Sequence, residues 1–156
     1  MSNLERMLQL ATEVFDVKND DNQLDVNEEV LEKLRLIHSN TVSEFNDENG
    51  PVIWLIAIPT TIELMELFVD SKITERELLD LTPVNSLYQV LYLCSALVLP
   101  EYRRQGKTLQ MALTAINNIK KEHPIKYLFV WSFSKEGDAL AQKISSITQL
   151  PLLRRK

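Results

Sequence analysis

The sequence has a single cysteine, Cys94, among its 156 residues, so no disulfide can form within the chain. Such usage is typical of a reducing compartment, and we expect a cytoplasmic protein. No apolar run approaches the ~20 residues that a membrane-spanning helix needs. The N-terminal stretch MSNLERMLQL has neither the cationic start nor the long apolar run of a secretory signal. We therefore expect no membrane partner.

Positive charge is scarce in most of the chain and concentrated in its last third. The net charge is -5, yet residues 100–156 carry eleven basic and four acidic side chains. This distribution favours an anionic ligand near the C-terminal third, although a solvated basic surface explains it equally well. Nucleic acid is a weaker interpretation, because the chain as a whole is acidic and has no basic-aromatic motif.

Hydrophobic periodicity and turn residues predict one mixed α/β (α+β) domain over residues 1–156, with a single central sheet. Asn49-Gly50 predicts the turn of a β-hairpin, and the nearly all-apolar second strand should be central and buried on both faces. A strand–helix–strand order in the second half requires a parallel crossover. The pattern predicts helices at 3–15, 26–40, 60–70, 74–81, 106–122 and 135–147, a hairpin at 41–60, strands at 86–99 and 125–133, and an edge strand or tail at 149–156.

The most informative stretch is VLPEYRRQGKTLQMAL, residues 98–113, which joins a predicted strand to a predicted helix. Its Gly106-Lys107-Thr108 matches the end of a nucleotide-binding P-loop. That motif needs its first glycine at position 101, where this chain has Glu101, a carboxylate that would face the phosphate. The next strand also lacks the aspartate expected to bind the metal. These departures argue against a P-loop.

The same stretch contains Pro-x-x-Arg-x-x-Gly directly before a helix. The first turn of a helix has unpaired N–H groups and the positive end of the helix dipole, so it binds phosphates. A strand, this turn and a helix together resemble motif A of the GNAT superfamily of acetyl-CoA-dependent N-acetyltransferases, with Arg103, Gly106 and Thr108 at the motif positions. The resemblance extends over roughly residues 41–147, since a hairpin precedes the motif and a strand and helix follow it.

The resemblance implies a fold in which the motif strand and the next strand diverge, so that the pantetheine arm of acetyl-CoA enters the gap. It implies an acetyl group transferred to an amine by direct attack in a ternary complex, with no metal. The acceptor would be a small-molecule or peptide amine, and a homodimer is compatible with the family. The cofactor-binding residues implied are Leu97, Val98 and Leu99 through their backbones, and Arg103, Arg104, Gln105, Gly106, Lys107 and Thr108 around the phosphates.

Three departures from the family pattern keep a second interpretation open. Thr108 replaces the usual glycine or alanine, and Ala141 and Gln142 stand where many members have a tyrosine that protonates the leaving thiolate. Extra N-terminal helices and a helical insertion before the motif strand change the region that forms the acceptor site. The alternative is a non-catalytic acyl-CoA-binding or protein-interaction module of the same fold.

No residue is marked as catalytic by its spacing. Candidates near the expected cleft are Cys94, Ser95, Ser132 and Ser134, and each also has a structural explanation, such as a small side chain in the core. Residues 16–28 resemble a calcium loop between two helices. In the two possible alignments Val17 or Lys18 falls on a ligand position, and in the first Asn22 replaces the glycine, so calcium binding is disfavoured.

Overall fold

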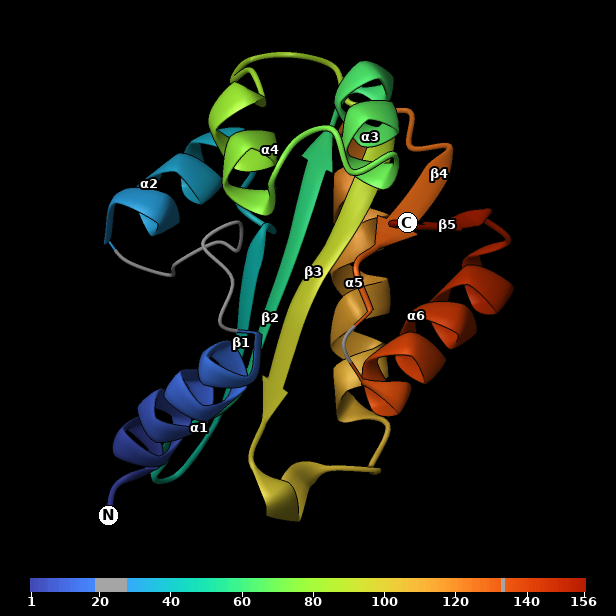
Figure 1. Cartoon of the computed structure of the whole chain (residues 1–156). Coiled ribbons are helices and arrows are strands. Elements are labelled where there is room, and N and C mark those ends of the chain that lie inside the picture. Colours follow the sequence, from blue (N-terminus) through green and yellow to red (C-terminus); the bar gives the residue numbers. More distant parts are fainter. Residues whose placement is uncertain (19–27, 133) are drawn as a thin grey trace.

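A computed structural model of the chain describes residues 1–18, 28–132 and 134–156 (Figure 1). The helices are α1 (Asn3–Lys18), α2 (Glu28–Ile37), α3 (Ile62–Val69), α4 (Glu75–Leu81), α5 (Lys107–Glu122) and α6 (Lys135–Thr148), with a short 3-10 turn, η1 (Pro100–Tyr102). The strands are β1 (Val42–Asp47), β2 (Gly50–Thr60), β3 (Val90–Val98), β4 (Tyr127–Val130) and β5 (Leu152–Arg154).

The described residues form a mixed α/β structure around one five-stranded sheet, with the strands in the order β1-β2-β3-β4-β5. The pairs β1–β2 and β2–β3 are antiparallel, whereas β3–β4 and β4–β5 are parallel. The predicted mixed sheet, hairpin and parallel crossover are therefore confirmed. Within the same residues, no helix is both long enough and apolar enough to cross a membrane.

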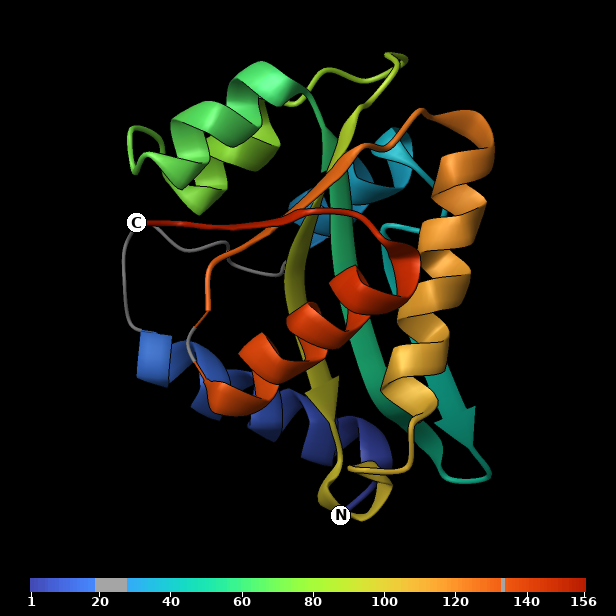
Figure 2. The same cartoon turned by 90° about the vertical axis from the view of Figure 1, so that its right-hand side faces the viewer.

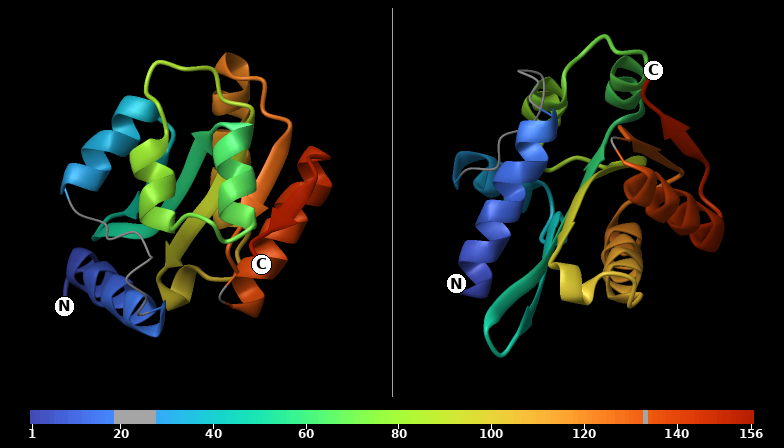
Figure 3. Two further views of the ribbon diagram at one scale, coloured as in Figure 1. Left: turned by 45° about the horizontal axis from the view of Figure 1, so that its top comes forward. Right: turned by 60° about the horizontal axis from the view of Figure 1, so that its bottom comes forward.

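Helices cover both faces of the sheet. Helix α5 lies on one face, and α3 and α4 lie on the other, as the side view in Figure 2 shows. Seen from the end where β3 finishes, α1 and α5 flank β2 and β3 from opposite sides (Figure 3, right). The central strands are consequently buried on both faces, which explains why most of β2 is apolar.

Aromatic side chains form the centre of the core between β3, β4 and α3. Phe68, Tyr92 and Phe129 are fully buried, and the Tyr92 and Phe129 rings stack with centroids 5.0 Å apart. The Phe68 ring meets Tyr92 edge-on at 4.9 Å. A second apolar cluster joins α1 to the lower ends of β2 and β3; its buried members are Met7, Val52, Ile53, Leu97 and Leu99.

Strand β4 is shorter than the sequence predicts. The apolar run 125–133 predicted one strand, but only Tyr127–Val130 joins the sheet. Beyond Val130 the chain turns away, and the Trp131 ring packs against the guanidinium of Arg155, 4.6 Å from its centroid. The apolar character of Trp131 thus reflects this packing and not a place in the strand.

We predict that Phe129→Ala lowers the free energy of unfolding by about 3–5 kcal/mol, because it removes a fully buried ring and leaves a cavity. Tyr127→Ala, on the same strand but 37% exposed, is the matched control and should cost much less. Urea denaturation of the two variants measures the difference. Equal losses would contradict this description of the core.

Candidate functional site

The turn between β3 and α5 ends in a left-handed glycine. Gly106 caps α5 with φ of 74°, and a Cβ built on it would meet no atom within 4 Å, so conformation alone favours glycine here. Arg104 also has a positive φ, of 63°. Because a helix has no internal acceptor for its first N–H groups, those of the first turn of α5 are available to a ligand.

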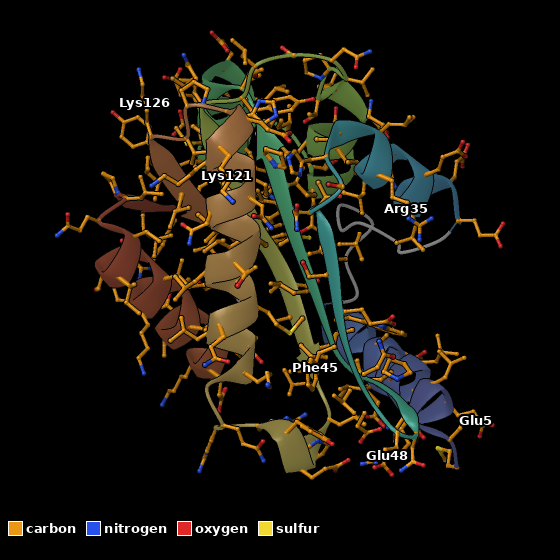
Figure 4. All side chains as sticks on the ribbon, turned by 180° about the vertical axis from the view of Figure 1, so that it is seen from behind. Glu5, Arg35, Phe45, Glu48, Lys121 and Lys126 are labelled. Atoms are coloured by element: carbon orange, nitrogen blue, oxygen red, sulfur yellow. The ribbon has the colours of Figure 1, made fainter. Side chains whose placement is uncertain are left out.

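Cationic side chains surround this helix end. Arg104 is exposed and makes no hydrogen bond or ion pair within the part of the chain that the structure describes. The Arg103 Nε donates to the Val98 carbonyl oxygen at 3.1 Å, and the Lys107 Nζ lies 4.5 Å from the centroid of the Phe45 ring. Figure 4 shows Phe45 beside the N-terminal half of α5. The N-terminus of α5 is therefore positively charged, and among the described residues the Arg104 guanidinium has no hydrogen-bond or ion-pair partner.

The acidic residue in this turn, Glu101, forms a salt bridge with Arg6 of α1. Arg6 donates to both carboxylate oxygens of Glu101, at 2.7 and 2.8 Å. Those hydrogen bonds hold the pKa of Glu101 below its ordinary value, and the pKa of Arg6 is raised in return. Glu101, the residue that argues against a P-loop, is thus engaged away from the helix end. Its negative charge opposes an anion there less than an unpaired carboxylate would.

A second contact fixes the turn against the hairpin. The Tyr102 hydroxyl donates to Asp47 Oδ2 at 2.6 Å, and Asn3 Nδ2 and the backbone N–H of Asn49 donate to Asp47 Oδ1. These donors lower the pKa of Asp47, the hydroxyl of Tyr102 having the largest effect. The two residues of the hairpin turn are Glu48 and Asn49, one position earlier than the predicted Asn49-Gly50. Asp47 therefore links α1, the hairpin and the turn before α5.

One edge of β3 is open along its second half. Pairing with β4 runs from Val90–Tyr127 to Leu93–Val130 and stops there. In Figure 1, β3 continues well past the end of β4. In the part of the chain that the structure describes, residues 94–98 of β3 therefore pair with β2 alone.

The register identifies which backbone groups face this open edge. The Leu99 N–H donates to the Val52 oxygen at 3.0 Å, and Leu97 lies opposite Trp54. Because alternate residues of a strand direct their N–H and C=O groups to opposite neighbours, Leu97 and Leu99 face β2 while Ala96 and Val98 face the open edge. Of the three predicted backbone ligands, only Val98 faces the gap, and sequence reasoning missed Ala96.

At Cys94 the sheet also has a bulge. Ser95 pairs with Ile56 and Leu93 with Ala57, so the register of β3 against β2 shifts by one residue at Cys94. The bulge directly follows Leu93–Val130, the last residue pair between β3 and β4.

A buried polar cluster lies beside this bulge. The Tyr92 hydroxyl donates to Glu75 Oε2 at 2.5 Å, and the Cys94 Sγ lies 3.8 Å from the same oxygen. Glu75 is 2% exposed and Cys94 9% exposed. Burial and the neighbouring carboxylate raise the pKa of Tyr92 well above its ordinary value, so its hydroxyl remains a donor at neutral pH. No pattern in the sequence pointed to Glu75, which resembles an ordinary acidic residue in the first turn of a helix.

The predicted serines have different surroundings. Ser134 caps α6, its Oγ accepting from the Gly137 N–H at 3.0 Å, and the Ser132 Oγ donates to Asp138 at 2.9 Å. Both line an open groove of about 570 Å³ at the N-terminus of α6. Ser95 is half-buried on β3, next to Cys94. The structure thus brings Cys94 and Ser95 together at the bulge, while Ser132 and Ser134 serve the start of α6.

Two histidines and a glutamate meet where α2 and α5 end, and their possible ligand atoms lie within 4.8 Å of one another. His38 Nδ1 accepts from the Asn40 N–H at 2.9 Å, and His123 Nδ1 accepts from the Tyr88 N–H at 3.3 Å. A neutral imidazole has one proton, so both protons are on Nε2. His38 Nε2 lies 2.8 Å from Glu122 Oε2, although its N–H is not aimed well at that oxygen. Because each Nε2 carries a proton, the cluster is better suited to contacts with Glu122 than to a metal.

The proposed calcium loop, residues 16–28, lies mostly outside the described residues, so the structure adds nothing to that alternative.

We predict that acid weakens the protein through His123. Burial, together with the nearby His38, lowers the pKa of His123 below its ordinary value near 6.5. The folded state therefore prefers the neutral ring, and its stabilising effect is present above about pH 6.5 and is lost as the pH falls through the folded pKa. In His123→Asn the amide oxygen can replace Nδ1 as acceptor without titrating. Denaturation from pH 7.5 to 5 should show a steeper loss for the wild type; parallel curves would exclude this role.

No family model, no curated protein and no solved structure matches this chain.

Proposed function

We propose that this protein is a GNAT-like acyltransferase that binds acetyl-CoA and transfers its acetyl group to an amine. The proposal rests on two neighbouring features: the backbone N–H groups at the N-terminus of α5 and the open edge of β3. A phosphate fits the first, and an extended amide-containing arm fits the second. Acetyl-CoA contains both parts in one molecule.

The residues around the turn fit the charged half of this ligand. The amides from Arg104 to Thr108 would bind the pyrophosphate at the helix N-terminus, where the dipole is favourable. Among the described residues Arg104 makes no hydrogen bond or ion pair, and Arg103 and Lys107 add positive charge beside it. Arg103 also donates to Val98, so part of its role is to fix the turn against β3.

The open edge of β3 fits the pantetheine arm. The arm has two amide groups, and the N–H and C=O groups of Ala96 and the N–H group of Val98 face the gap, while the Val98 carbonyl accepts from Arg103. The arm would then add to the sheet as a short strand does. This assignment favours Ala96 and Val98 over Leu97 and Leu99, whose backbones face β2.

The chemistry at the end of the arm is a direct displacement. The acceptor nitrogen forms a bond to the thioester carbon, the carbon–sulfur bond breaks, the nitrogen loses a proton and the leaving thiolate gains one. Cys94 and Ser95, two of the catalytic candidates predicted from the sequence, directly follow the last residue pair between β3 and β4. No covalent intermediate on the protein and no metal is needed.

The alternative is an acyl-CoA-binding or protein-interaction module without turnover. Two observations favour it. Thr108 has a branched, half-buried side chain at the third motif position, and Ala141 is buried in α6, a helix that contains no tyrosine. Binding of acetyl-CoA without turnover of any amine in a broad panel would support the module.

We predict that acetyl-CoA stabilises the protein against heat, whereas ATP with magnesium does not. A ligand at 100 times its dissociation constant stabilises by about 2.7 kcal/mol, which raises the midpoint by about 5–10 °C in a domain of this size. Arg104→Gln removes a charge-assisted hydrogen bond of about 1.5–3 kcal/mol and should weaken binding by about 10- to 100-fold.

The control for this experiment is Lys121→Gln, an exposed lysine at the opposite end of α5 that Figure 4 labels. It loses the same charge and should leave the shift unchanged. Stabilisation by ATP alone would favour a nucleotide site instead. Absence of any shift with acetyl-CoA would remove the proposed function.

A further inference from the structure

A groove of about 270 Å³ lies between strand β1 and the first half of α5. Its wall on α5 is formed by residues from three successive turns that share one face of the helix: Lys107, Gln110, Met111, Thr114 and Ala115. The Lys107 Nζ lies 4.5 Å from the centroid of the Phe45 ring of β1, and Figure 4 shows Phe45 beside this part of α5. The groove therefore begins at Lys107 and follows about two turns of the helix.

Polar side chains converge on this groove from both of its walls. Among the residues that the structure describes, the side chains of Asn40, Ser43, Gln110 and Thr114 line the groove and form no hydrogen bond. In the larger groove at the start of α6, the serines and the aspartate have partners within the protein. Convergent polar groups above an apolar floor are the usual arrangement of a small-molecule site.

Two opposite charges lie at the same end of the groove. Glu44 lines it from β1 and accepts from the Trp54 Nε1 at 2.6 Å and from the Asn46 Nδ2 at 3.3 Å. Both donors are neutral, so they fix the carboxylate in place without compensating its charge. Lys107 lies against Phe45, the next residue of β1. Within the described part of the chain, neither Glu44 nor Lys107 forms an ion pair, with the other or with a third residue.

The two charges together define the class of ligand. An anion would be attracted by Lys107 and repelled by Glu44, and a cation would experience the reverse. A zwitterion with its two charges on neighbouring atoms is attracted by both. Further along the same face of α5 the groove is lined by the half-buried Met111 and the buried Ala115, which suit an aliphatic group.

We propose that this groove binds a free α-amino acid with a short aliphatic side chain. The Lys107 ammonium would donate to the carboxylate of the ligand, and the Glu44 carboxylate would accept from its amino group. The aliphatic side chain would pack on Met111 and Ala115. The inference goes beyond the proposed function and does not depend on it, because the groove lies outside the gap between β3 and β4.

The probe is L-valine, and two of its analogues each lack one charge: isovalerate lacks the amino group, and isobutylamine lacks the carboxylate. Amide proton–nitrogen correlation spectra are recorded during titration of the protein without acetyl-CoA. We expect millimolar L-valine to shift the signals of groove residues, among them Ser43, Glu44, Gln110 and Thr114. Because each analogue loses a hydrogen bond between charged groups, each should bind about 10- to 100-fold more weakly.

Charge-removing variants test the two side chains directly. Glu44→Gln still has an oxygen that accepts from Trp54 but loses the negative charge, and Lys107→Gln loses the positive charge. Each should weaken L-valine binding by about 10- to 100-fold. The matched controls are Glu48→Gln and Lys121→Gln, which make the same changes at exposed positions outside the groove, labelled in Figure 4. Both controls should bind L-valine as the wild type does.

Three results would overturn the inference: no shift of the groove signals with L-valine, an analogue that binds as tightly as L-valine, or unchanged affinity in Glu44→Gln and Lys107→Gln. The analogues are titrated into the wild type, so they decide the question even if a variant does not fold. Because acetyl-CoA is absent from these titrations, their failure leaves the proposed function standing. A protein that binds L-valine but not acetyl-CoA would retain this site and lose the proposed function.

Discussion

The early end of the pairing between β3 and β4 is the constraint on which the rest of the site depends. Four residue pairs join these parallel strands, and after Leu93–Val130 the two chains separate. Unpaired backbone groups in a sheet are costly if they are buried and useful if a ligand pairs with them. The separation leaves β3 an edge at Ala96, which is exposed, and at Val98, which is half-buried, and the turn into α5 follows directly.

Interactions far apart in the sequence keep this arrangement in place. Arg6 of α1 pairs with Glu101, and Asp47 of the hairpin accepts from Tyr102. Both contacts involve the turn that leads into α5, and both engage its acidic neighbours. At the resulting helix N-terminus Gly106 has a left-handed conformation, and among the described residues Arg104 has no hydrogen bond or ion pair. Electrostatics and backbone geometry therefore favour the same class of ligand, an anion.

The order of helices and strands could be predicted from the sequence, because periodicity, caps and turn residues are local signals. Helix α5, predicted at 106–122, begins at Lys107 and ends at Glu122. The apolar run that predicted a central strand is β2, between β1 and β3. The hairpin turn lies at Glu48 and Asn49, one residue earlier than predicted, and there Asp47 accepts from the Asn49 N–H.

The details of the site could not be predicted in the same way. The bulge at Cys94 shifts the register of β3 by one residue, and a shift of one reverses which groups face the gap. Glu75 and Tyr92 are 17 residues apart and meet only because α4 packs on β3. Trp131 extends the apolar run of β4 but packs on Arg155 outside the sheet. Each of these depends on tertiary packing, which leaves no local pattern in a single sequence.

We propose that one ligand engages both the open edge of β3 and the N-terminus of α5. Hydrogen–deuterium exchange with and without acetyl-CoA tests it at the level of single amides. We expect slower exchange at Ala96 and Val98 and from Gln105 to Leu109, with little change at Leu97 and Leu99, whose backbones face β2. Protection confined to the α5 turn would leave only an anion site. Protection elsewhere in the chain would contradict the account.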